Sequence, residues 1–188
     1  MRTALSVILA AVLVGPAFAY DDNTMGMFFS DSDFSDEARN HDTSTAPFNG
    51  YVVLLAPTVS TVGGYEVGIS ISESSVFVLG ASGPNGWTNF GQNLNHLVGY
   101  LTPLSVYGGG TVLATVQLMY TADQHVRIVF GAADPASMPD VPVIADGSDP
   151  NILIGCEVLG IDGNVASLNA PPPVADEANW SSVKSLFD

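Results

Sequence analysis

The chain has 188 residues, of which 47% are hydrophobic and 12% are charged, and its formal net charge at pH 7 is −15. This acidic balance excludes nucleic-acid backbones and anionic membrane surfaces as the main partners, because both attract clustered Lys and Arg. It permits cation binding, and it keeps an exported protein in solution.

The first nineteen residues have the pattern of an export signal. Arg2 supplies a positive start, residues 4–14 form an apolar run, and residues 17–19 read Ala-Phe-Ala, a small-x-small cleavage motif. The run is shorter than the ~20 residues that span a bilayer. We therefore expect cleavage before Tyr20 and a secreted protein of the extracellular space, the periplasm or the cell surface, with no membrane span.

Cleavage there leaves a chain of single-domain size. We expect a β-sandwich domain over residues 20–170, then a proline linker and amphipathic tail over residues 171–188. Cys156 is the single cysteine, so no disulfide can form within the chain. Because it alternates with Ile152, Ile154 and Val158, we interpret it as a small buried apolar side chain, with a disulfide between chains as the alternative.

Short strands separated by turn signals follow one another along the chain. The alternation is clearest over residues 65–72, where Tyr65, Val67, Ile69 and Ile71 share one face. Residues 87–101 stay open between strand and loop, and Pro142 favours a sheet edge for its segment. The strands expected are residues 25–30, 48–56, 65–72, 75–81, 111–120, 125–130, 141–145 and 151–159.

Eight or nine short strands, with no helical period before the tail, predict an all-β fold. We expect an antiparallel sandwich of two sheets. In residues 111–120 the expected inward face consists of Val112, Ala114, Val116, Leu118 and Tyr120.

The strand pattern of two segments resembles that of cohesin-like β-sandwiches. The segments are residues 62–86 and 108–122, and the second contains Leu113-Ala114-Thr115 where that family has a leucine-alanine-threonine core. The resemblance implies a jelly-roll or immunoglobulin-like sandwich that binds protein or carbohydrate without catalysis. The chain departs from a cellulosomal scaffold in having one such unit and no visible dockerin.

The tail gives a second resemblance, to uncharacterised secreted bacterial sandwich proteins that end in W-x-x-V-K-x-L-aromatic. The chain has Ser181 and a final Asp188 where those relatives often have Gly and Arg. This likeness implies no particular activity. The matching residues here are Trp180, Val183, Lys184, Leu186 and Phe187.

Four aromatic residues lie in or beside expected loops: Trp87, Phe90, Tyr100 and Tyr107. Exposed rings on a sandwich stack on sugar faces or anchor a protein partner, which makes these four the candidate ligand-binding residues. The alternative for Trp87 is a plug that closes one end of the core.

The loop after the first expected strand is rich in oxygen ligands. Asp31, Asp33 and Ser35 have the alternate spacing of calcium loops, and Asp36 adds a carboxylate. Asp36 stands where an EF-hand requires Gly, so the loop is not an EF-hand. We expect no obligatory cofactor; the two interpretations of the loop are a looser Ca²⁺ site and a solvated acidic surface.

No catalytic motif is present in the sequence. His41, His96 and His125 have no metal-ligand spacing, and Ser82 is not in a G-x-S-x-G motif. We therefore expect that the protein is not an enzyme. The remaining enzymatic alternative is a secreted hydrolase that pairs His96 or His125 with a carboxylate.

Three prolines, residues 171–173, form a stiff spacer before the tail. Trp180, Val183 and Phe187 share one helical face, and a helix this short needs a surface to pack on. Three interpretations stay open: a frayed tail or cap on its own domain, a tag for export or surface attachment, and a contact with another copy.

The function expected from the sequence is a secreted, non-catalytic binding or structural module of the bacterial cell exterior that acts through protein–protein contacts. The alternative is a carbohydrate-binding or calcium-stabilised adhesion module.

Overall fold

The computed structural model describes residues 20–42 and 46–171 of the chain. The expected signal at residues 1–19 and the tail residues from 172 onward lie outside them. Among the described residues, no helix has the length and apolar character that crossing a membrane requires.

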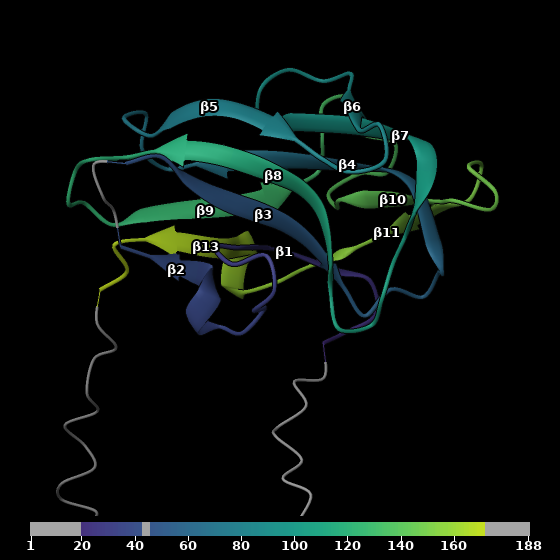
Figure 1. Cartoon of the computed structure of the whole chain (residues 1–188), viewed down its shortest axis with the longest axis horizontal. Helices are drawn as coiled ribbons and strands as arrows, with labels where there is room; N and C mark the ends of the chain where they lie inside the picture. The colour runs from purple at the N-terminus through teal and green to yellow at the C-terminus, as the bar shows by residue number, and fades with distance from the viewer. Residues whose placement is uncertain (1–19, 43–45, 172–188) are drawn as a thin grey trace, which may run out of the picture.

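The strands form two sheets that pack face to face as a sandwich (Figure 1), which confirms the all-β prediction. Sheet A has the order β12-β1-β3-β8-β5 and sheet B the order β11-β10-β4-β9-β13-β2, with β7 pairing β4 and β6 pairing β7. Sheet A consists of β1 (Thr24–Phe28), β3 (Phe48–Leu55), β5 (Phe77–Ser82), β8 (Thr111–Met119) and β12 (Glu157–Val158). Sheet B consists of β2 (Asn40–His41), β4 (Thr61–Ile71), β6 (Thr88–Asn89), β7 (Asn95–Ser105), β9 (Val126–Gly131), β10 (Val143–Asp146), β11 (Leu153–Gly155) and β13 (Asn164–Leu168).

The strongly alternating segments form the predicted strands. In β4 the side chains of Tyr65, Val67 and Ile69 are buried and those between them are more exposed, because successive residues point to opposite faces. Cys156 is buried, as predicted, and burial raises the pKa of its thiol to about 12. Short 3₁₀ turns, η1 (Glu37–Arg39) and η2 (Ile161–Gly163), complete the described secondary structure.

The C-terminal part of the sandwich differs from the prediction. Residues 151–159 are not one strand: β11 pairs with β10 in sheet B, the chain turns at Cys156, and β12 pairs with β1 in sheet A. The β1–β12 pair and the β2–β13 pair are parallel, so the sheets are not purely antiparallel. The sequence analysis also missed β13, whose apolar residues are few and interrupted by Asn164 and Ser167.

Two further segments are now assigned. The strand predicted over residues 141–145 is not at a sheet edge, because β10 lies between β4 and β11; Pro142 comes just before it, where its missing N–H costs no ladder bond. The undecided segment 87–101 contains β6 and most of β7, which run antiparallel to each other.

A β-bulge in β8 changes which residues face the core. The register with β3 shifts between Val52–Ala114 and Val53–Val112, so that Leu113 is the extra residue. Leu113 is fully buried in the main core, whereas Val112, predicted to share the face of Ala114, packs on the opposite side of sheet A.

The molecule has a second, smaller apolar cluster besides the core between the sheets. Phe28, Val53 and Leu55 point to the outside of sheet A and are nonetheless buried. The acidic loop of residues 30–39 covers them, with the Phe34 ring 5.2 Å from that of Phe28 in an edge-to-face arrangement. One half of the outer face of sheet A is therefore covered and the other half is open.

Candidate binding surface

Trp87 lies where the chain passes from β5 of sheet A to β6 of sheet B. It follows the tight turn made by Asn85 and Gly86, both at positive φ, and its backbone N–H donates to the Pro84 carbonyl at 2.9 Å. The half-buried ring packs against the main core, and its Nε1 donates to the Tyr65 hydroxyl at 3.3 Å. The ring is therefore a plug, as in the alternative interpretation, and not a platform for a ligand.

Tyr100 is also internal, which corrects the expectation that it lies exposed in a loop. It lies in β7, is only 9% exposed, and its hydroxyl donates to the Leu113 carbonyl at 2.8 Å. Burial raises the pKa of this phenol above its ordinary value. A buried ring with a satisfied hydroxyl has no face left for a sugar.

His96 is buried beside Trp87 and Tyr65 and does not act as an accessible base, which contradicts its place in the hydrolase alternative. Its Nδ1 lies 2.9 Å from the Tyr65 hydroxyl. Since that hydroxyl accepts from Trp87, its proton is available to Nδ1, and the ring proton then belongs on Nε2. Nε2 is buried without a hydrogen-bond partner in the described part of the chain. Burial lowers the pKa of His96 to about 4, so the ring is neutral at neutral pH.

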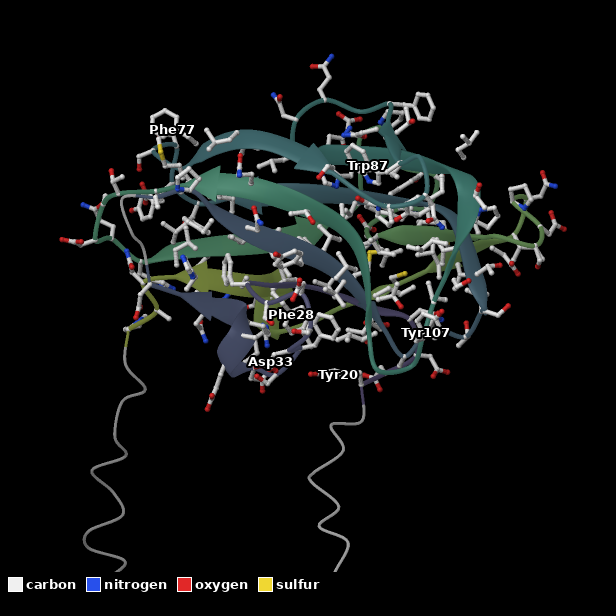
Figure 2. The ribbon with its side chains drawn as sticks, viewed as in Figure 1. Tyr20, Phe28, Asp33, Phe77, Trp87 and Tyr107 are labelled. Carbon is white, nitrogen blue, oxygen red and sulfur yellow. The ribbon has the colours of Figure 1, made fainter. Side chains whose placement is uncertain are left out.

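Phe90 and Tyr107 are exposed as predicted, with 77% and 67% of their surfaces accessible. Phe90 follows β6, whereas Tyr107 lies in the loop between β7 and β8, well below Trp87 in the view of Figure 2. The four predicted aromatic residues thus do not form one surface: two are internal and two are exposed.

The acidic loop makes contacts within itself. Asp33 accepts from the Ser35 N–H at 3.0 Å, and Asp36 pairs with Arg39 at 3.0 Å. Within residues 20–42 and 46–171 no group of three or more His, Cys, Asp or Glu could hold a metal ion. Asp31, Asp33 and Asp36 of the predicted set therefore form no such group, and the looser calcium site that would include Ser35 stays a prediction.

The predicted partner residues of the tail, from Trp180 to Phe187, lie outside the described residues. The structure also has an uncharged outer surface that was not predicted from the sequence. Away from its edge, the open half of sheet A presents small, neutral and mostly polar residues. They surround a shallow depression of about 310 Å³ lined by Asn49, Gly80, Ala81, Ser82, Thr115 and Gln117. We call the surface formed by these residues with Phe77 and Leu79 the open face.

The open face carries no charge, although the chain has nineteen acidic residues. None of the residues of β3, β5 and β8 is Asp, Glu, Lys or Arg. The sequence signal was therefore available: three strands without a charged residue in a highly acidic chain. It was missed because strand pairing, which brings β3, β8 and β5 side by side, is not visible in the sequence.

Two large apolar side chains border this face at its free edge. β5 is the terminal strand of sheet A, and Phe77 and Leu79 on it are 59% and 48% exposed. Phe77 lies at one end of β5 and points away from the sandwich (Figure 2). Edge strands are commonly guarded by charged residues or Pro, and β5 has neither.

The fold has known counterparts among solved structures. The sixth cohesin of scaffoldin B from Acetivibrio cellulolyticus, solved in complex with a mutant Cel5 dockerin, superposes with a TM-score of 0.51 at 6% identity, over 80% of this chain and 98% of that one. The third ScaB cohesin of R. flavefaciens, solved with a group 1 dockerin, gives a TM-score of 0.47 at 12% identity, over 82% of this chain and 100% of that one. No family model and no curated protein matches the chain. The chain has a cohesin-like β-sandwich fold.

Proposed function

We propose that the protein is an exported, non-catalytic binding module of the bacterial cell exterior, and that a partner protein docks on the open face of sheet A. The observation that carries this proposal is the absence of charge from β3, β5 and β8 in a strongly acidic protein. The cores of protein interfaces are depleted of charged residues, because docking removes their water.

The composition of the open face suits a partner that binds reversibly. Its Asn, Gln, Ser and Thr side chains are hydrated in the free protein and can exchange water for a partner's hydrogen bonds. Asn49, Thr115 and Gln117 supply both donors and acceptors. Such a face remains soluble alone, which an apolar surface of the same size would not.

Phe77 and Leu79 supply the apolar anchors of the proposed interface. Large exposed side chains next to a neutral polar surface are typical of the few residues that dominate binding energy. The free edge of β5 also offers backbone groups to which a partner segment can add.

The shared fold supports a protein as the partner. The Acetivibrio cohesin of the same fold was solved in a complex with a dockerin, which is a protein. The export pattern of residues 1–19 supports a location outside the cytoplasm.

The test uses the purified exported protein as bait for the extracellular proteins of its source. Phe77→Asp places a charge at the anchor, and Gln117→Glu adds one charge to the open face with almost no change of shape. Ile161→Asp is the matched control, because Ile161 is 82% exposed and lies in η2, which contacts β9 of sheet B and does not line the open face.

We expect the wild type and Ile161→Asp to capture the same partner, and the purified pair to form a complex of defined stoichiometry. Phe77→Asp should weaken that complex by roughly 30-fold, the loss of a hot spot of about 2 kcal/mol. Gln117→Glu should weaken it about tenfold, because a carboxylate would be buried without a partner. Equal capture by all four proteins would refute the proposal, and light scattering separates it from self-association.

A further inference from the structure

A second concave surface lies outside the open face. A groove of about 740 Å³ runs between residues 90–95 on one side and residues 132–135 on the other, with Gly68, Ile69 and Ser70 of β4 at its base. This volume falls within the ~300–1,000 Å³ range of small-molecule sites. The exposed Phe90 lines this groove, so one predicted ligand-binding residue lies on it.

The first wall of the groove is held in shape by one half-buried side-chain amide, that of Asn89. Asn89 Oδ1 accepts from the N–H groups of Gly91 and Leu97 at 3.0 and 2.9 Å, and its Nδ2 donates to the Asn95 carbonyl at 3.3 Å. Gly91 is required here, because a Cβ at this position would collide with the Asn95 carbonyl oxygen. The wall is therefore formed before any ligand arrives.

The second wall is tied to the first by another amide. Asn95 Oδ1 accepts from the Asp134 N–H at 2.9 Å, while Asn95 Nδ2 donates to the Asp134 carbonyl. Both hydrogen-bonding functions of the side chain are thus used to fix the width of the groove. A groove fixed in this way binds without paying the entropy of ordering loops.

The lining has a particular chemistry. Phe90 offers an aromatic ring, and Gln92 and Asn93 are exposed with side-chain amides that have no hydrogen-bond partner among the described residues. Asp134 is the single charged residue of the lining, which contains no Lys, Arg or His. The groove therefore combines one flat apolar ring, free donors and acceptors, and no group that would attract an anion.

We propose that this groove is a binding site for a neutral oligosaccharide. The apolar C–H face of a sugar ring would pack on Phe90, while its hydroxyl groups, each both donor and acceptor, would pair with the amides of Gln92 and Asn93. An acidic sugar or a phosphate would face Asp134 with no compensating cation. The site is separate from the open face, so its failure and that of the proposed protein interface are distinguishable.

The experiment titrates the purified exported protein with hexasaccharides of glucose, xylose, mannose and N-acetylglucosamine, and with a galacturonate hexamer and an uncharged Gly-Ser octapeptide. Calorimetry gives Kd, and backbone amide NMR shifts locate the binding. We expect at least one neutral sugar to bind and to shift the amides of Gly91, Gln92 and Asn93. Phe90→Ala, and the double variant Gln92→Ala with Asn93→Ala, should each weaken it at least tenfold.

Tyr107→Ala is the matched control, because it removes another largely exposed aromatic ring, one that does not line the groove. It should keep wild-type affinity, as should Phe77→Asp, and unchanged thermal unfolding shows that each variant is folded. No binding of any neutral sugar at millimolar concentration would overturn the proposal. So would sugar binding that survives Phe90→Ala, or stronger binding of the galacturonate hexamer or the peptide.

Discussion

The two halves of the outer face of sheet A share strands yet differ in what they present. At one end, Phe28, Val53 and Leu55 are apolar and lie beneath the acidic loop. At the other end, Asn49 and Gln117 are polar and uncovered. The half beneath the protein's own loop is apolar and buried, whereas the open half is neutral and mostly polar, with Phe77 and Leu79 exposed at its edge, and is accessible to another molecule.

The covered half should respond most strongly to truncation. Phe28→Ala removes a fully buried ring and its contact with Phe34, and we expect a loss of about 3–5 kcal/mol in the free energy of unfolding. Urea unfolding followed by fluorescence measures it. A loss below about 1 kcal/mol would show that the loop is not a structural cover.

Acid offers a way to weaken the core without touching either half of the outer face. His96 has a pKa of about 4 in the folded protein against 6.5 as its ordinary value, so the unfolded state binds more protons between these pH values. The contribution of neutral His96 to the free energy of unfolding should be fully present above pH 6.5. The free energy of unfolding should fall by roughly 3 kcal/mol as the pH drops to 4.

Unfolding curves at several pH values test this expectation. His96→Gln, which does not titrate in this range, should flatten the slope between pH 4 and 6.5. The same slope in the variant and the wild type would assign the acid sensitivity to other groups.

Removing the hydrogen bonds that attach the covering loop should lower the free energy of unfolding by an intermediate amount. The Arg39 guanidinium donates to the carbonyls of Val165 and Asn164 at 2.7 and 2.9 Å, which ties the loop to β13. Arg39→Met keeps the aliphatic stem and removes these donors, at an expected cost of about 2 kcal/mol. Asp36→Asn breaks only an exposed ion pair and should cost less than about 0.5 kcal/mol, which equilibrium unfolding can resolve.

Substitutions on the open half should hardly change the free energy of unfolding of the isolated protein. Phe77→Ala removes a ring that is 59% exposed, so its free energy of unfolding should change by no more than about 0.5 kcal/mol. Thermal unfolding of Phe28→Ala and of Phe77→Ala therefore compares directly how much the covered and the open half contribute to stability. A large loss from Phe77→Ala would place that ring in the fold instead of at an interface.

The candidate sites were only partly predictable. Phe90 was found from its type and its position after a turn, and it does line the groove. Tyr100 and Trp87 were chosen by the same reasoning but are internal, because β6 and β7 pair with each other and carry both toward Tyr65 and the core. The clamping role of Asn95 joins residues 39 positions apart, so no local pattern marks it, whereas Asn89 bonds residues within eight positions of itself.

The all-β class, most strands and the burial of Cys156 could be predicted from the residues alone, because alternation and turn residues act over a few neighbours. Three features became apparent in the folded protein: residues 151–159 cross from one sheet to the other, Leu113 is a bulge, and the acidic loop covers half of the outer face of sheet A. These features depend on pairing and packing between residues distant in the chain. The sequence of an acidic loop indicates a solvated segment, because it does not show which face of a sheet the loop covers.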